Sequence, residues 1–567
     1  MKTMKNKFSR KSLLLVSMTV ILATVINLFA GVVAFAAEDT TTYTIEAVPF
    51  SQGQGTEEDP YLISVPGHLV QIGTSGLDKH YKLMNNIDLS TVENNTKKYA
   101  AWTPLGDDGN PFAGTFDGNG HTISGFSISY AYKFTGFFAK VEGGTVKNLT
   151  LADATLNLVA ANFRAGVFAG VAGKGSISGC KTESTVNVIC NVTLFSNDNS
   201  VDVGGIVGYL AGCDITYCEN NAKITVDNCK TSGGNYGACT GGIVGHLYGG
   251  TISYCVNNGP VTLKDYVNKK GNGCTAAGGI VGNQNVKWDN TGTVEYCINN
   301  GAVSDLTGTN SQTWNASAGG IAGTIKLESG TSNTKNCYNF GSITVGTSNQ
   351  NVGGQIVGYY VAKDGTNITK NYGTSEIGAK YGGGSDKAAI TTPNFEIKSE
   401  AELKASDGYK AIATEVAEHL TGVSTDLYGY QTTKKTDDNK FDMRLVATLS
   451  GDISKCVNVG FRVSVTYKLN GADQKKAPEN NITVTTLYEA ITATDGAGAE
   501  DNTKTHTAAS LGGDYIFVLA CKDLPAAATD IAFTVTTFYT GANGEVYSET
   551  ETFGITVPED TLPELAA

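Results

Sequence analysis

Positive charge and proline are both scarce in this chain. It holds 41 lysine and arginine residues against 54 acidic ones, and only four of the basic residues are arginine. Nucleic acids and anionic membranes are bound mainly by clusters of basic side chains, so neither is expected as a partner. Charged residues of either sign make up only 17% of the chain. Solubility must therefore rest on serine, threonine and asparagine.

Glycine, by contrast, is abundant and periodic. The block Gly-Gly-Ile-Val-Gly or a close variant begins at residues 204, 241, 278, 319 and 353, at spacings of 37, 37, 41 and 34. In most copies it is followed by an apolar run ending in Tyr-Cys or Asn-Cys and then by an asparagine corner, such as Glu219-Asn220-Asn221. A fixed period of this length indicates that one structural unit is stacked repeatedly.

Each unit contains three short runs rich in β-branched and aromatic residues and no helical period. Such runs, separated by glycine or Asn-Asn corners, predict three short strands per unit. Equivalent asparagines in successive coils could also hydrogen-bond to one another. The sequence therefore predicts an all-β fold, a right-handed parallel β-helix, in which roughly nine coils at ~4.8 Å form a rod. A β-propeller is the alternative, but its blades need four antiparallel strands.

Six segments follow from these patterns. We predict a signal peptide at 1–36, an N-terminal segment at 37–60, the β-helix at 61–397, a helical cap or linker at 398–424, a β-sandwich at 425–560 and a tail at 561–567. Ser399 to Glu402 forms a capping-box pattern that starts the helical segment. After it, alternating strands separated by turns favour an immunoglobulin-like sandwich.

The leader indicates export. Five basic residues precede an apolar run from Leu13 to about Phe29, and Ala34-Phe35-Ala36 fits a cleavage site. The alternative is an uncleaved membrane anchor, because the run is nearly long enough to span. Cleavage leaves 36 basic against 54 acidic residues, a net charge of −18. We expect a secreted or surface-associated protein with no membrane insertion after cleavage.

A family resemblance adds to this interpretation. Residues 53–63 (Gly-x-Gly-Thr-Glu-Glu-Asp-Pro-Tyr-Leu-Ile), 102–106 (Trp-Thr-Pro-Leu-Gly) and 112–123 resemble the N-terminal part of GLUG-repeat proteins, and the glycine blocks are similar to the GLUG motif. Such proteins are secreted by, or found on, Gram-positive anaerobes and include non-catalytic regions of some immunoglobulin A proteases. The resemblance implies a right-handed parallel β-helix and an adhesive role, and it carries no catalytic residues.

The cysteines follow the repeat. Cys218, Cys255, Cys297 and Cys337 occupy equivalent places, and Cys180 extends the series. In-register side chains are poorly aimed for disulfides, so we expect a column of buried, reduced thiols. Metal binding by this column is disfavoured, because a straight column supplies no tetrahedron and no C-x-x-C occurs.

Catalytic motifs are missing. Parallel β-helices also carry polysaccharide lyases and glycoside hydrolases, which is the alternative function. Arg164 is the only arginine of the repeats, and the best acidic pair, Asp107-Asp108, lies in a Gly-Asn loop that favours a turn. His121 and His246 are interpreted as surface or corner residues. No serine-nucleophile, zinc-protease or phosphate-loop motif occurs. The sequence predicts no enzyme, no catalytic residue, and no metal or cofactor.

Three tryptophans remain as candidate ligand-stacking residues: Trp102, Trp288 and Trp314. Sugars stack on exposed aromatic rings, and the last two lie in the longer inserts between units. They could instead cover the core from outside. We predict a monomeric adhesion or binding protein for cell-wall glycans, host glycans or surface proteins. A passive stalk of the cell envelope is a further alternative.

Overall fold

The computed structural model describes residues 42–555 with internal gaps. The residues left out within this span are 94, 130–132, 160–162, 192–200, 228–229, 232–236, 265–266, 269–274, 307–315, 347–351, 361–363, 376–394, 422–423, 435–439, 451–455, 457, 470–471, 477–481, 485–486, 488–489, 492–505, 508–514, 526–528, 542–543 and 548–550. The predicted signal peptide and the predicted tail lie outside the described residues.

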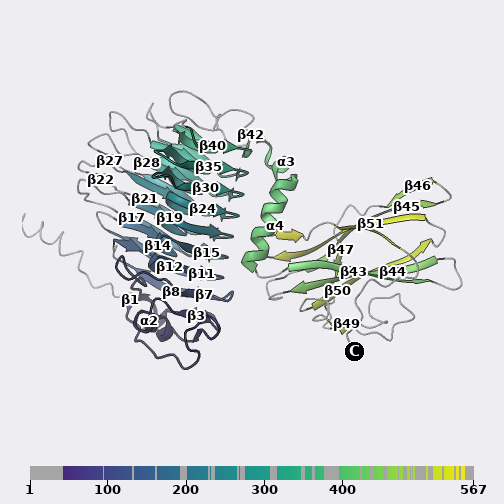
Figure 1. Ribbon diagram of the computed structural model, residues 1–567, viewed down its shortest axis with the longest axis horizontal. Helices are drawn as coiled ribbons and strands as arrows, with labels where there is room; N and C mark the ends of the chain where they lie inside the picture. The colour runs from purple at the N-terminus through teal and green to yellow at the C-terminus, as the bar shows by residue number, and fades with distance from the viewer. Residues whose placement is uncertain are drawn as a thin grey trace, which may run out of the picture.

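The repeats wind into a rod of parallel strands, seen edge-on in Figure 1. One stack, here the glycine-edge stack, consists of β9 (Phe134–Thr135), β13 (Phe163–Gly166), β18 (Val201–Gly204), β23 (Ala238–Gly241), β28 (Thr275–Gly278), β33 (Ala316–Gly319) and β38 (Val352–Gly354). Its register joins Gly204 to Gly241 and Gly241 to Gly278, so each coil lies directly on the one before.

Two further stacks complete each coil. The long-strand stack runs through β2 (Tyr61–Ile63), β3 (His80–Leu83), β7 (Thr115–Asp117), β11 (Gly144–Lys147), β15 (Gly175–Ser178), β19 (Val207–Thr216), β24 (Val244–Ser253), β29 (Val281–Val286), β34 (Ala322–Leu327) and β39 (Val357–Tyr360). The asparagine stack contains, in the central coils, β20 (Glu219–Asn220), β21 (Lys223–Asp227), β25 (Val256–Asn257), β26 (Val261–Lys264), β31 (Ile298–Asn299), β32 (Val303–Leu306), β36 (Tyr338–Asn339) and β37 (Ile343–Val345). Neighbours in all three stacks pair parallel, which confirms the β-helix and rules out a propeller.

Glycine is required where the glycine-edge stack turns into the long-strand stack. A Cβ on Gly205 would lie 2.1 Å from the Gly242 carbonyl oxygen, and a Cβ on Gly242 would lie 2.1 Å from that of Gly279. Neither distance is possible for a real side chain, and the obstacle is backbone of the next coil. The Gly-Gly pair is therefore dictated by the close stacking of coils. The isoleucine that follows each of the first four pairs is fully buried, as Ile206 and Ile243 show.

The predicted asparagine contacts are present inside the rod. Asn220, Asn257, Asn299 and Asn339 are all 0% exposed. Each of the first three donates its amide to the side-chain oxygen of the next, at 2.8 Å in every case. The ladder satisfies polar groups at a buried corner that water does not reach, which is the condition for burying them at little cost.

The predicted cysteine column is also confirmed. Cys180, Cys218, Cys255, Cys297 and Cys337 are free thiols with no exposed surface. The Cys255 Sγ donates to the Ile215 carbonyl oxygen at 3.6 Å, and its neighbours repeat this contact. Burial raises the pKa of the Cys255 and Cys337 thiols well above its ordinary value, so both stay protonated.

A helix and aromatic side chains lie at the first coil. Helix α2 (Pro66–Ser75) begins with a proline in its first turn and connects β2 to β3. Phe50 stacks on Tyr61 at 4.6 Å between ring centroids, and Tyr81 and Phe112 continue inward at 6.4 Å from each other. Within the described residues, none of the helices has the length and apolar character that crossing a membrane requires.

Helices α3 (Glu400–Ala405) and α4 (Asp407–Thr421) follow the rod. The predicted capping box forms, with Ser399 and Glu402 bonding reciprocally. Both helices run along the side of the rod, between it and the C-terminal sheets, and do not cover its end (Figure 1). Leu403, Ile412 and Val416 pack there against Ile298 and Tyr338. The helical segment is thus a side-docked linker.

Two antiparallel sheets form the C-terminal sandwich. One contains β43 (Ser424–Lys434), β44 (Lys440–Ser450) and β50 (Tyr515–Pro525), and the other contains β45 (Asn458–Leu469), β46 (Ala472–Lys476), β47 (Ile482–Val484), β51 (Thr529–Gly541), β52 (Gly544–Tyr547) and β53 (Glu551–Gly554). Their facing sides share a core, in which Phe461 lies 5.0 Å from Phe517 between ring centroids. The predicted β-sandwich is confirmed.

Candidate functional site

The three candidate tryptophans have different surroundings. Trp102 is only 6% exposed, its ring stacks on Phe137 at 4.6 Å, and its Nε1 donates to the Phe137 carbonyl oxygen. Trp288 is 81% exposed. Trp314 lies outside the described residues. Ligand stacking by these residues stays a prediction, and of the two tryptophans that the structure describes, Trp288 is the one with an accessible indole face.

A cavity of about 440 Å³ lies beside Trp102. It is lined by the first coil and by the loop after Trp102, including Thr103, Asp107 and Asn110. Asp107 is already engaged, because its Oδ1 accepts hydrogen bonds from the backbone N–H groups of Gly109 and Asn110 at 2.7 Å each. The predicted turn role of Asp107 is confirmed.

The neighbouring acid, Asp108, is paired with two lysines. Its carboxylate lies 2.7 Å from Lys133 Nζ and 3.5 Å from Lys140 Nζ. The hydrogen bond from Lys133 lowers the pKa of Asp108 below its usual range. A general acid needs a raised pKa, so the geometry does not equip this pair for glycoside hydrolysis.

Trp288 ends a row of aromatic side chains on the flank of the rod. The Tyr209 ring, on β19, stacks on Tyr248 of β24 at 5.9 Å, and Tyr248 meets Trp288 edge to face at 5.9 Å. Trp288 lies in the turn between β29 and β30 (Thr291–Glu295), where Ser329 Oγ accepts its backbone N–H at 2.7 Å. We call Tyr209, Tyr248 and Trp288 the aromatic row.

The backbone at the exposed end of this row is unusual. Trp288 and Asp289 both have left-handed conformations, with φ of 53° and 60°. This region is costly for a bulky side chain, by roughly 1–2 kcal/mol per residue. Tyr254 and Tyr296 share the conformation, but their rings stack on each other at 5.0 Å between centroids. Both also pack against the apolar cluster that contains Ile412 and Val416 of α4. Trp288 has no such burial to offset the cost.

Charged side chains surround the Trp288 turn. Lys287 Nζ lies 2.8 Å from Glu328 Oε1, and Lys326 Nζ lies 3.8 Å from the same oxygen. Partial burial tends to raise the pKa of Glu328, but the hydrogen bond and charge of Lys287 together with the charge of Lys326 outweigh it, so the pKa is lowered. Glu328 is therefore ionised at neutral pH. The turn presents an open indole face beside a fixed acceptor and two amines.

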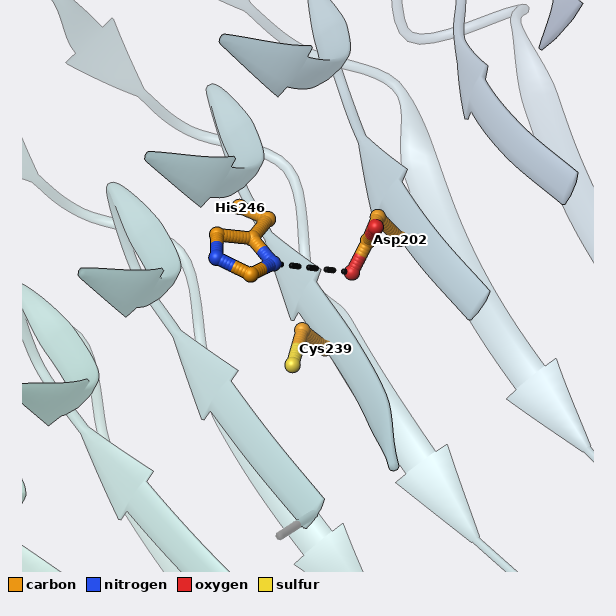
Figure 2. Close-up of side chains that lie close together, drawn as sticks. All are labelled: Asp202, Cys239 and His246. Atoms are coloured by element: carbon orange, nitrogen blue, oxygen red, sulfur yellow. Dashed lines mark hydrogen bonds and ion pairs between the residues drawn. The ribbon is translucent and has the colours of Figure 1, made fainter. Parts of the chain in front are cut away.

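A second group of polar residues lies where the aromatic row begins. Asp202 of β18, Cys239 of β23 and His246 of β24 converge from three strands, as Figure 2 shows. His246 Nδ1 lies 3.3 Å from Asp202 Oδ1. On the other side, Arg164 Nε lies 3.5 Å from Asp202 Oδ2, and the Arg164 guanidinium covers the Tyr209 ring at 3.7 Å from its centroid.

The interpretation of His246 as a surface or corner residue is wrong. Its side chain is 15% exposed and it contacts a carboxylate with no exposed surface. The register shows a signal that could have found this group: Arg164, Asp202 and Cys239 occupy equivalent positions in successive strands, two residues before the last glycine of each. These residues stand where the later coils have Ala276, Ser317 and Val352.

Comparisons with known proteins give partial matches. No family model matches the chain, so membership of the GLUG-repeat proteins stays a prediction. Over 148 residues the chain is 32% identical to a protein of Evansella cellulosilytica described as a Gly-rich membrane protein; this covers 26% of the chain and 15% of that protein. Over 179 residues it is 32% identical to halomucin of Haloquadratum walsbyi, covering 29% of the chain and 2% of halomucin. The chain thus spans a small part of these relatives.

Two solved structures match part of the chain. A protein of Bacteroides ovatus described as an immunoglobulin A1 protease matches 62% of this chain and 88% of its own, with 22% identity and a TM-score of 0.38. A structure described as IgA1 protease matches 62% of this chain and 24% of its own, with 14% identity and a TM-score of 0.35. Both descriptions name a protease, which contradicts the prediction that the chain is not an enzyme, and that prediction is withdrawn. At these TM-scores the matches transfer no activity.

Proposed function

We propose that the protein acts outside the cell, secreted or held at the surface, and that its β-helical rod binds carbohydrate through the exposed end of the aromatic row. The observation that carries the proposal is Trp288: an indole that is 81% exposed on a left-handed backbone, where it gains little from burial. Strained conformations that packing does not repay concentrate at binding sites.

The chemistry around Trp288 fits a glycan. An indole face stacks on the apolar face of a sugar ring, while Glu328, Lys287 and Lys326 offer an acceptor and donors for its hydroxyl groups. The Tyr248 ring packs against the indole at nearly a right angle. The names of the two relatives, a membrane protein and halomucin, support an extracellular setting for the proposal. Cell-wall or host glycans are the proposed ligands.

A retention experiment tests this proposal. The full chain without its first 36 residues is mixed with insoluble cell wall, mucin and plant polysaccharides, and the bound fraction is measured at increasing polysaccharide. Trp288→Ala is expected to weaken retention at least about tenfold, because a central aromatic contact is typically worth 1–2 kcal/mol or more.

The matched control is Val92→Ala, which removes a side chain 70% exposed elsewhere on the rod. It should leave retention unchanged. Equal retention of both variants, or no retention of the parent protein on any of the three materials, would contradict the proposal. Oligosaccharides appearing in the supernatant would show that binding is accompanied by cleavage.

A further inference from the structure

The Asp202–Cys239–His246 group brings together three kinds of metal ligand. A carboxylate, a thiol and an imidazole each place one ligand atom so that all three atoms lie within 4.8 Å of one another. Asp202 is 0% exposed and Cys239 is 5% exposed. Figure 2 shows the three side chains close together, with the contact between His246 and Asp202 marked by a dashed line.

We propose that Asp202, Cys239 and His246 form a binding site for a borderline-soft divalent cation of the Zn²⁺ type. Thiolate and imidazole ligands select such ions over Ca²⁺ and Mg²⁺, which require oxygen ligands. Three protein ligands leave the fourth position of a tetrahedral ion open to water or to an outside group. This metal site is separate from the proposed carbohydrate-binding site at Trp288, and the proposal does not depend on carbohydrate binding.

The distances suit this ion. Nitrogen and oxygen atoms bound to one tetrahedral Zn²⁺ at about 2.0–2.1 Å lie roughly 3.3–3.4 Å apart. The His246 Nδ1 and Asp202 Oδ1 atoms are 3.3 Å apart. A sulfur at about 2.3 Å from the ion would lie roughly 3.5–3.6 Å from each of them. The separations among the three ligand atoms are all within 4.8 Å, so each exceeds this spacing by at most about 1.3 Å, and the Cys239 side chain would have to move closer to complete the site.

Arg164 supports the arrangement from outside. Its Nε lies 3.5 Å from Asp202 Oδ2, the oxygen that does not face His246. Hydrogen-bonding partners on the far atoms of a ligand orient it toward the metal. The guanidinium is in turn held by the Tyr209 ring. A thiolate from Cys239 and the Asp202 carboxylate would together balance the two charges of a divalent ion, and the Arg164 guanidinium leaves the group with a net charge of +1.

Within the described coils the set of three residues occurs once, with Asp202 in one coil and Cys239 and His246 in the next. The positions of Cys239 and His246 become Ala276 and Asn283 in the next coil. Two coils further along than Cys239 and His246, the same positions hold Ser317 and Thr324, whose hydroxyl oxygens lie 2.8 Å apart. The two positions therefore face each other within one coil. Cys239→Ala and His246→Asn each copy a residue that the rod already accommodates there.

Titration with metal alone tests the site. The full chain without its leader and without an affinity tag, chelator-treated and kept reduced, is titrated with ZnCl₂ by calorimetry and with Co²⁺ by absorption. We expect one Zn²⁺ per chain and a thiolate-to-Co²⁺ charge-transfer band. Cys239→Ala and His246→Asn should each weaken Zn²⁺ binding at least about tenfold, since even outer partners of a metal site cost 10–100-fold.

Cys213→Ala is the matched control, because Cys213 is a buried free thiol of the rod outside this group. It should bind Zn²⁺ as the parent does. Circular dichroism verifies that each variant is folded. Absence of saturable Zn²⁺ binding, absence of the Co²⁺ charge-transfer band in the parent protein, or equal affinity in Cys239→Ala and the parent would overturn the proposal.

Discussion

Asn257→Ala tests the buried asparagine ladder. Asn257 donates to the Gly259 carbonyl oxygen at 3.0 Å and to Asn299 Oδ1 at 2.8 Å, and its own Oδ1 accepts from Asn220 Nδ2 at 2.8 Å. Truncation takes one bond from each of three buried partners. A buried polar group left short of a partner costs about 1–3 kcal/mol, and single substitutions rarely exceed about 5 kcal/mol. We expect a loss of about 3–5 kcal/mol in the free energy of unfolding.

Asn258→Ala is its control. Asn258 takes part in a second row of amides, with 2.9 Å to Asn221 Oδ1 and 2.7 Å from Asn300 Nδ2, and that row is exposed to water. Its Nδ2 also donates to Glu219 Oε1 at 3.2 Å, but that oxygen keeps its shorter bond from Asn221 Nδ2 at 2.7 Å when Asn258 is truncated. Its truncation should change the free energy of unfolding by no more than about 0.5 kcal/mol. Both asparagines bond to amides of neighbouring coils, but only Asn257 is buried. The difference between the two variants in the free energy of unfolding therefore reports on the burial of these hydrogen bonds.

Urea unfolding followed by tryptophan fluorescence measures both variants. All three tryptophans belong to the predicted rod and none to the sandwich, so the signal reports on the rod. The midpoint should fall for Asn257→Ala while the dependence on urea stays the same, because the surface exposed on unfolding is unchanged. A difference between the two variants of less than about 1 kcal/mol would refute the reasoning.

Two further predictions concern pH and close packing. Burial raises the pKa of Cys255, so this thiol stays protonated in the folded chain, whereas in the unfolded chain it ionises at about pH 8.5. The free energy of unfolding is therefore unaffected by this thiol below about pH 8.5. Above that pH it should fall by up to about 1.4 kcal/mol per pH unit and thiol. Alkaline unfolding in reductant measures this slope, which Cys255→Ala should reduce; an unchanged slope would contradict it. Gly242→Ala would place a Cβ 2.1 Å from the Gly279 carbonyl oxygen and should destabilise the rod by about 1–3 kcal/mol, whereas Gly73→Ala in α2, with open space around its Cβ, should stabilise it by about 0.5–1 kcal/mol. Thermal unfolding compares the two, and a loss of stability in both would refute the packing argument.

The features that repeat were predictable from sequence. The repeat places Asn257 over Asn220 and Cys255 over Cys218, so their stacking follows as soon as the coil is inferred. The glycine pair could be foreseen as a tight feature, though its cause, the carbonyl of the next coil, required the structure. Residues that recur in each repeat occupy equivalent positions in successive coils, so their neighbours can be predicted from the sequence.

The features that break the period were not predictable in the same way. His246 occupies the register position of Tyr209, so a sequence comparison treats it as a tolerated substitute. Its contact with Asp202 depends on the direction of the His246 side chain relative to the neighbouring coil, which the sequence does not give. The side docking of α4 depends on the column of Tyr217, Tyr254 and Tyr296, whose rings lie outside the rod core. The burial of Trp102 depends on a partner 35 residues away.

A structure of the complex tests the proposed glycan binding most directly. The parent protein would be crystallised with an oligosaccharide prepared from whichever polysaccharide retains it. The account predicts a sugar ring stacked on the indole of Trp288, with hydroxyl groups within hydrogen-bonding distance of Glu328 or Lys287. A sugar bound elsewhere, such as in the cavity beside Trp102, with the Trp288 face left open, would contradict it.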